Sequence, residues 1–208
     1  MSALFQSVLL LIIPASAQTT GLAQIRKDAQ SLMPLAKQNV TRQFLEAVFD
    51  LPEVKPRQLL CDPVTKKFYT EAEADVLDEV KRKALVPVTI GESFYYNTRY
   101  GSPLAYARPL EILGEFGLKS VSGKKILDFG YGTVGHLRLL AYGGAQVVGV
   151  EVDPLLPTLY GDPSDQGPIT GKSGQTGSIR LVDGQFPATP SVTQVVGEGY
   201  DIILSKNT

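Results

Sequence analysis

The sequence has few of the side chains from which nucleophilic and metal sites are usually built. It contains one cysteine, Cys61, one histidine, His136, and no tryptophan. A single cysteine excludes a disulfide within the chain, and we expect Cys61 to be a structural thiol. Zinc sites of the cysteine–histidine type need more ligands than these two residues supply, so no metal site is expected. A Cys–His or Ser–His–Asp catalytic arrangement is not indicated either, because His136 lies far from Cys61 and inside a glycine-rich segment.

An excess of charge of either sign is also missing. The 20 lysines and arginines face 21 aspartates and glutamates, which gives a formal net charge of −1. Contacts with a nucleic-acid backbone require clustered basic side chains, so the sequence has no nucleic-acid signature. Hydrophobic residues make up 43% and charged residues 20% of the 208 residues. This balance is typical of a globular protein, and the length suffices for one sizeable domain with an extension.

Long apolar segments are absent too. The most apolar stretch, residues 4–13, is shorter than the roughly 20 residues that a transmembrane helix needs. The small residues Ala15, Ser16 and Ala17 follow it at the spacing that a signal peptidase reads, which predicts residues 1–17 as an export signal. No Lys or Arg precedes the apolar stretch, so a short buried or interfacial helix is the alternative. We expect an exported or periplasmic protein if the signal is genuine and a cytoplasmic one otherwise.

Residues 18–90 are predicted to form a helical N-terminal extension. Apolar side chains recur at helical spacing through residues 22–50. Prolines then interrupt the pattern. Further on, Thr70 and Glu73 match a capping box, and this motif predicts a charged helix that continues to about Leu85.

Residues 91–208 change to an alternation of strands and helices, which is typical of an α/β domain. The expected strands cover residues 125–129, 146–152, 178–182 and 200–204, with a helix at 134–142 and a long loop at 161–177. This order is the beginning of an open, doubly wound, Rossmann-like sheet. An open sheet that stopped at its fourth strand would leave an exposed edge. We therefore expect the chain to be a fragment, incomplete at its C-terminal side.

The turn between the first strand and its helix carries the strongest motif. Gly130, Gly132 and Gly135 form a G-x-G-x-x-G pattern there. Glycines allow the tight turn and a close approach of the backbone to a ligand, and the helix start offers free N–H groups. Glu151 ends the second strand, about 20 residues further on, where a carboxylate can accept hydrogen bonds from the hydroxyls of a ribose. Asp153 is the alternative acid. The pattern predicts a ligand that contains a nucleoside.

Two further acidic positions bear on the kind of nucleoside. Asp128 lies two residues before Gly130 in an otherwise apolar strand. An acid there would repel a pyrophosphate but would favour a ligand with cationic groups. Asp183 and Gly184 follow the third strand, where an acid and a flexible backbone can meet the amino group of an adenine.

These segments together resemble a known family. Residues 126–135 resemble the first signature of class I S-adenosylmethionine-dependent methyltransferases, and residues 148–154 resemble their second-strand signature. Residues 181–184 and 200–205 are similar to the third and fourth strands of that family. The resemblance covers roughly residues 95–208, so we expect residues 91–208 to form the S-adenosylmethionine-binding core.

The resemblance implies S-adenosylmethionine as the cofactor and assigns residues to its parts. It implies Asp128, Gly130 and Gly132 near the methionine moiety, Glu151 on the ribose and Asp183 on the adenine. Tyr131 occupies a position where the family often has Cys, Ala or Ser. The resemblance also implies that Gly149 leaves room for the adenosine, and that Tyr95, Tyr96, Arg99 and Tyr100 close over the cofactor, unless these aromatic side chains pack as core instead.

The methyl acceptor and the catalytic residues are not assigned by the sequence. Residues 205–208 replace the Asn/Asp-Pro-Pro-aromatic tetrad that marks methylation of amino groups in bases or glutamine. Two alternatives remain beside methyl transfer. One is an NAD(P)-dependent oxidoreductase that uses the same glycine-rich turn. The other is a truncated, non-catalytic remnant of a methyltransferase.

Overall fold

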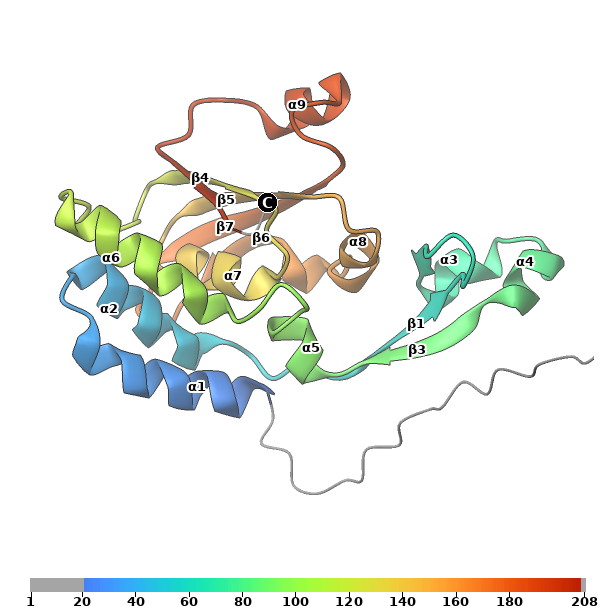
Figure 1. The fold of residues 1–208 in the computed structure, drawn as a ribbon, viewed down its shortest axis with the longest axis horizontal. Helices are drawn as coiled ribbons and strands as arrows, with labels where there is room; N and C mark the ends of the chain where they lie inside the picture. The colour runs from blue at the N-terminus through green and yellow to red at the C-terminus, as the bar shows by residue number, and fades with distance from the viewer. Residues whose placement is uncertain (1–20, 207–208) are drawn as a thin grey trace, which may run out of the picture.

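The structure, a computed structural model, describes residues 21–206. The predicted export signal at 1–17 lies outside the described residues. Figure 1 shows a twisted central sheet, a layer of helices on one of its faces, and an arm that reaches away from this body. None of the helices in residues 21–206 combines the length and the apolar character that crossing a membrane requires.

The central sheet has five strands in the order β6-β7-β5-β4-β8. The strands are β4 (Lys125–Phe129), β5 (Gln146–Glu151), β6 (Gly167–Thr170), β7 (Thr176–Asp183) and β8 (Ile202–Ser205). The strands from β7 to β8 are parallel, and β6 is antiparallel to β7. The chain therefore has a mixed α/β fold with a mostly parallel sheet flanked by helices. The four strands predicted from the sequence are confirmed, with small shifts at their ends.

The predicted long loop at residues 161–177 is wrong, because this segment contains β6 and half of a hairpin. Ile169 is buried against the core, and the hydroxyls of Thr170 and Thr176 pair across the two strands at 2.8 Å. Pro168 argues against a strand in the sequence, because proline has no backbone N–H to donate. Strand β6 lies at the edge of the sheet, where a missing N–H is tolerated.

The helices of the body cover the sheet unequally. They are α1 (Gly21–Leu32), α2 (Asn39–Glu46), α5 (Glu92–Tyr96), α6 (Ala107–Glu115), α7 (Val134–Tyr142), α8 (Leu155–Leu159) and α9 (Pro190–Val196). The short 3-10 turns are η1 (Met33–Leu35), η2 (Ala47–Asp50), η3 (Pro103–Tyr106) and η4 (Pro163–Asp165). Helix α7 packs on the sheet and is buried along its whole length, while α1, α2 and α6 form an outer layer on the same side (Figure 1). Helix α9 covers part of the opposite face.

The core follows this arrangement. The larger apolar cluster lies between the sheet and the layer of α1, α2, α6 and α7. A smaller cluster on the other face consists of Leu127, Val148, Val150, Val182 and Val196. The central strands β4 and β5 are buried on both faces, which explains why they read as continuous apolar runs in the sequence.

The arm consists of residues 57–90. It is built from β1 (Arg57–Cys61), β2 (Phe68–Tyr69), α3 (Glu71–Asp75), α4 (Glu79–Ala84) and β3 (Val86–Ile90), with an antiparallel sheet in the order β2-β1-β3. The prediction of a helical extension through residue 90 is therefore wrong for this part. The capping box of Thr70 and Glu73 is confirmed. The helix that it starts ends early, because Asp78 caps a second helix by accepting a hydrogen bond from Lys81 N.

Candidate ligand-binding site

The glycine-rich turn joins β4 to α7, and its glycines serve different needs. Gly130 and Gly132 have φ angles of +75° and +57°, a conformation that other residues rarely adopt. A Cβ atom on Gly132 would lie 2.7 Å from the Cβ of Tyr100. Gly135 lies within α7, where a Cβ would come to 3.0 Å from the Cβ of Pro103. The first two glycines therefore shape the turn, and the third allows close packing of the helix.

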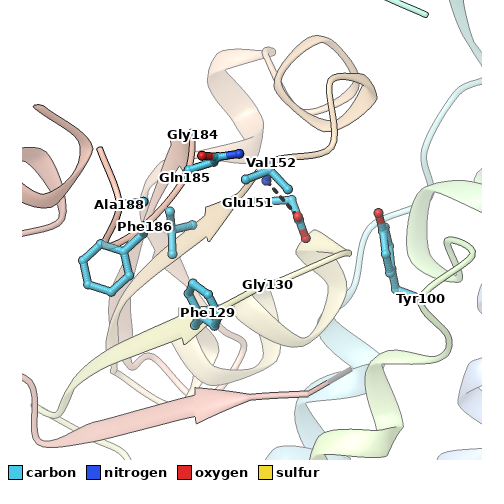
Figure 2. A pocket seen from close by; sticks show the side chains of 10 residues that line it. Tyr100, Phe129, Gly130, Glu151, Val152, Gly184, Gln185, Phe186 and Ala188 are labelled. Atoms are coloured by element: carbon cyan, nitrogen blue, oxygen red, sulfur yellow. Dashed lines mark hydrogen bonds between the residues drawn. The ribbon is translucent and has the colours of Figure 1, made fainter. Parts of the chain in front are cut away.

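A cavity of about 520 Å³ opens at the carboxyl ends of β4, β5 and β7. Its lining comes from Tyr100, Phe129, Gly130, Val150, Glu151, Val152, Gly184, Gln185, Phe186 and Ala188 (Figure 2). Three of the residues predicted from the sequence, Gly130, Glu151 and Gly184, meet in this cavity. Carboxyl ends of parallel strands are the usual place for ligands in open α/β sheets, so this is the candidate site.

The Glu151 carboxylate is held at the edge of the cavity. It is 9% exposed, its Oε2 accepts a hydrogen bond from Gly132 N at 3.2 Å, and its Oε1 accepts one from Val152 N at 2.8 Å. Figure 2 shows the carboxylate facing the side on which Tyr100 lies. Among the described residues that line the cavity, Glu151 is the only one with a charged side chain. A carboxylate can accept about four hydrogen bonds, so Glu151 keeps capacity for a ligand.

The carboxylate of Asp153, the alternative acid, already accepts hydrogen bonds from other groups of the protein. Its Oδ2 accepts hydrogen bonds from Arg99 Nη2 at 2.8 Å and from the Tyr100 hydroxyl at 2.9 Å. Its Oδ1 accepts one from Leu155 N at 3.0 Å, at the start of α8. Burial raises the pKa of the Tyr100 hydroxyl, which keeps it protonated as a donor. These contacts support Glu151 over Asp153 as the acid available to a ligand.

The aromatic segment before the sheet divides into two parts. Tyr95 and Tyr96 are 1% and 0% exposed and belong to the core. Tyr100 lines the cavity, and Arg99 lies beside it on Asp153. The alternative that these aromatic side chains pack as core is therefore confirmed for Tyr95 and Tyr96, whose side chains fill the space beside α7.

Asp128 does not line the cavity. It is fully buried and accepts hydrogen bonds from the Tyr106 hydroxyl, at 3.0 Å to Oδ2, and from His136 Nε2. The rings of Tyr106 and His136 stack at 3.6 Å. Burial, and then the Asp128 charge, raises the pKa of Tyr106, so the hydroxyl stays a donor. In this structure Asp128 secures α7 against β4 beneath the turn, and its expected place beside the ligand is not where the side chain lies.

Tyr131 also points into the protein. It is 3% exposed and belongs to the apolar core. A Cβ atom on Gly149 would lie 2.8 Å from Tyr131 Cδ1. The glycine in β5 therefore makes room for the Tyr131 ring, and the expectation that it makes room for an adenosine is wrong.

Asp183 and Gly184 end β7 next to Glu151. Gly184 lines the cavity with a φ of +132°, and its N–H donates to the Glu151 carbonyl at 2.8 Å. Asp183 is exposed and pairs in register with Glu151, without lining the cavity itself. Although the residue is exposed, partial desolvation of its carboxylate at the strand end raises the pKa of Asp183.

The sequence did not single out the apolar walls of the cavity. Phe129 and Phe186 lie with their ring centres 6.0 Å apart, and Gln185 and Ala188 complete that side. Phe129 could have been found as the last residue of a predicted strand. Phe186 belongs to the segment after β7, which has no periodic pattern.

Within residues 21–206, no group of three or more His, Cys, Asp or Glu side chains is arranged to hold a metal ion. Comparison of the chain with protein-family models, curated proteins and solved structures finds no match.

Proposed function

We propose that the chain binds S-adenosylmethionine in the cavity at the ends of β4, β5 and β7, as the cofactor-binding part of a class I methyltransferase. The observation that carries the proposal is the meeting of Gly130 and Glu151 in one cavity, with Gly132 N bonded to the Glu151 carboxylate. A glycine-rich turn beside an acid at the end of the neighbouring strand is the arrangement that holds a nucleoside.

The strand order supports a Rossmann-like, doubly wound arrangement. Strands β5 and β7 lie on one side of β4, and β8 lies on its other side. The order of the strands thus reverses at β4. In open α/β sheets this switch point is where ligands bind, and the glycine-rich turn leaves the sheet there.

The N–H groups of the turn favour S-adenosylmethionine over a dinucleotide. Gly130 N donates to Val150 O at 2.9 Å, Gly132 N to Glu151, and Gly135 N to the Thr133 hydroxyl at 3.2 Å. A pyrophosphate would need such donors at the start of the helix. Among the described residues, the cavity lining also has no basic side chain to balance a pyrophosphate. Asp128 does not line the cavity and plays no part in this preference.

The residues of the chain would contribute binding and orientation. S-adenosylmethionine carries the electrophilic methyl group, and transfer requires alignment with a nucleophile more than a dedicated acid or base. Glu151 would accept hydrogen bonds from the ribose hydroxyls with its remaining lone pairs. Asp183, at the rim, would receive the adenine amino group. Phe129 and Phe186 would shield the apolar side of the ligand from water.

Isothermal titration calorimetry tests the proposal with S-adenosylhomocysteine, NAD⁺ and NADP⁺ as separate ligands. We expect saturable binding of S-adenosylhomocysteine and none of the dinucleotides. The Glu151→Gln variant should weaken binding about tenfold, because a charge-assisted hydrogen bond to the ribose becomes a neutral one. The control is Glu79→Gln, which removes an exposed charge that pairs with Lys83 on α4. Binding of NAD⁺ or NADP⁺ without S-adenosylhomocysteine would overturn the proposal in favour of an oxidoreductase.

Methyl transfer itself needs a second measurement. Transfer of a labelled methyl group from S-adenosylmethionine to acceptor mixtures would support the enzyme. Tight binding of S-adenosylhomocysteine with no transfer to any acceptor would instead identify the chain as a non-catalytic remnant.

A further inference from the structure

The joint between the arm and the body contains a buried ionic cluster, separate from the cavity described above. The chain enters the arm at Arg57, the first residue of β1, and returns to the body through α5, which carries Tyr95. Between them lies Asp165, which is 0% exposed. Its carboxylate accepts hydrogen bonds from Arg57 Nη1 at 2.7 Å, from Arg138 Nη2 at 3.0 Å, and from the Tyr95 hydroxyl.

The cluster has more positive than negative buried charge. The side chains of Arg138 and Arg57 are 7% and 21% exposed, and both share the single carboxylate of Asp165. Arg138 also donates a hydrogen bond to the Ser164 carbonyl at 2.7 Å, and Arg57 donates one to the Leu159 carbonyl. One guanidinium charge is therefore left without a buried counter-charge. An uncompensated charge in a protein interior is unfavourable unless an ion or a polar group approaches it.

A cavity of about 420 Å³ lies against the two arginines. Other charged residues on its wall are Glu53, Lys55 and Asp162. Glu53 and Lys55 carry opposite charges and are both exposed. Asp162 is exposed, and its side chain accepts a hydrogen bond from Ser164 N. The remaining charged residues of the lining are Arg57, Arg138 and Asp165.

The positive field of the arginines reaches the rim of this cavity. Hydrogen bonds from Ser164 are the main cause that lowers the pKa of Asp162, and the charges of Arg57 and Arg138 lower it further. The Nε atom of Arg138 is buried and has no hydrogen-bond partner among the described residues. A buried N–H of a guanidinium at a cavity wall is a donor suited to an anionic oxygen.

We propose that the cavity at the arm joint binds a small anion, a carboxylate or phosphate group, beside Arg57 and Arg138. Guanidinium groups present planar pairs of N–H donors that match the oxygens of both groups. Because Arg57 belongs to the arm and Arg138 to α7, the bound anion links the arm to the body. Binding to the folded chain then raises its thermal stability with the logarithm of the anion concentration once this exceeds Kd. This inference does not depend on the proposed methyltransferase function.

The test measures thermal unfolding and calorimetric binding of the full chain with sodium phosphate, sodium succinate and sodium chloride at equal ionic strength. Phosphate or succinate should give a saturable binding isotherm in calorimetry and raise the unfolding temperature progressively above its Kd. Chloride should do neither. The more effective of the two identifies whether phosphate or carboxylate is preferred. No saturable effect of either anion would overturn the proposal.

Variants separate a specific site from a general salt effect. Arg57→Lys keeps the charge at a partly exposed position but loses the planar pair of donors, and should weaken anion binding about tenfold. The control is Arg82→Lys, which changes an exposed arginine that pairs with Glu71 and Asp75 in the arm. Equal affinities of wild type and Arg57→Lys would contradict the site.

The Asp165→Asn variant should change the affinity for the anion in the opposite direction to Arg57→Lys. Its amide has the size of the carboxylate but no charge, so the two arginines lose their internal counter-charge. Folded Asp165→Asn should therefore bind phosphate more tightly than wild type. Unchanged or weaker binding in the folded variant would contradict the proposal, and if this variant does not fold, Arg57→Lys decides the question.

Discussion

Two cavities of the body lie at the two ends of residues 95–100 and differ in the charged side chains of their linings. The cavity at the strand ends contains Glu151 and is walled by Tyr100. The cavity at the arm joint contains Arg57 and Arg138 and is walled by Tyr95. The proposed ligands differ because the carboxylate of Glu151 lies in one lining and the guanidinium groups of Arg57 and Arg138 lie in the other.

A shared set of hydrogen bonds runs between the two cavities. The Thr133 hydroxyl, in the glycine-rich turn, donates to the Tyr96 carbonyl at 2.9 Å, and the Tyr160 hydroxyl donates to the Tyr95 carbonyl at 2.8 Å. Both sites thus depend on a correctly placed α5. Variants that perturb one site at a time therefore show whether the other site responds.

The largest effect is expected from Asp165→Ala at the arm joint. Removing this carboxylate leaves two arginines without a buried counter-charge, and loss of one partner of a buried ion pair costs about 3–5 kcal/mol. Urea unfolding measures the free energy of unfolding. Added phosphate should recover part of the loss, because an anion in the cavity replaces the missing charge.

A matched variant in the arm shows what an exposed pair contributes. Asp75 forms an ion pair with Arg82, and both side chains are about half exposed. Asp75→Ala should change the free energy of unfolding by less than about 1 kcal/mol. A loss for Asp165→Ala that is no larger than this would mean that the joint cluster is as solvated as the surface pair.

The next largest effect is expected from Gly132→Ala at the strand ends. The new Cβ would meet the side chain of Tyr100 at 2.7 Å, and a φ of +57° is unfavourable for alanine. We expect a loss of about 1–3 kcal/mol in the free energy of unfolding and a loss of measurable S-adenosylhomocysteine binding. The response to phosphate at the arm joint should stay as in the wild type.

Gly123→Ala is the matched control for this variant. Gly123 also has a positive φ, of +73°, but no atom lies within 4 Å of a Cβ built there. It should therefore show only the backbone cost of about 1 kcal/mol, with unchanged ligand binding. Equal binding by Gly132→Ala and Gly123→Ala would mean that the contact between the turn and Tyr100 does not shape the site.

The sequence predicts the centre of the sheet well because the information there is local. Strands β4 and β5 are short apolar runs, and the turn between β4 and α7 needs glycines at Gly130 and Gly132 for reasons of backbone conformation. The arm was missed because its sheet depends on distant pairing. Residue Arg57 pairs with Ile90, and Leu60 pairs with Pro87, across two intervening helices. A local periodic pattern does not predict pairing between residues that lie so far apart in the sequence.

The candidate site was predicted in part for the same reason. Strand ends locate Gly130, Glu151 and Gly184 at one edge of the sheet, and the topology follows from the alternation of elements. The sequence does not show which way a side chain points in or next to a strand that is buried on both faces. Asp128 and Tyr131 point into the protein because His136 and Gly149 receive them, and no pattern within their own segments shows that.

The smallest effect, and the one that best sharpens the comparison, is expected from Asp183→Asn. Partial desolvation raises the pKa of Asp183 above its ordinary value of 3.8, so folding favours the protonated form. Relative to the variant, the wild type is therefore most stable at pH values below 3.8. It loses this stability as the pH rises through the folded-state pKa of Asp183. At pH 7 Asp183→Asn should be more stable than wild type by less than about 0.5 kcal/mol, yet bind S-adenosylhomocysteine more weakly.

The Asp201→Asn variant should change the stability at pH 7 in the opposite direction. A hydrogen bond from the Lys125 backbone, and then one from Lys124, lowers the pKa of Asp201, so its contribution to stability is present at neutral pH and is lost as the pH falls through the folded-state pKa. Unfolding measured from pH 7 to pH 3 should therefore show the two variants departing from wild type in opposite directions at pH 7 and converging in acid. If Asp183→Asn instead lost stability at pH 7 as Asp201→Asn does, Asp183 would be a structural acid. It would then not be a carboxylate held at the rim, at some cost, for an adenine amino group.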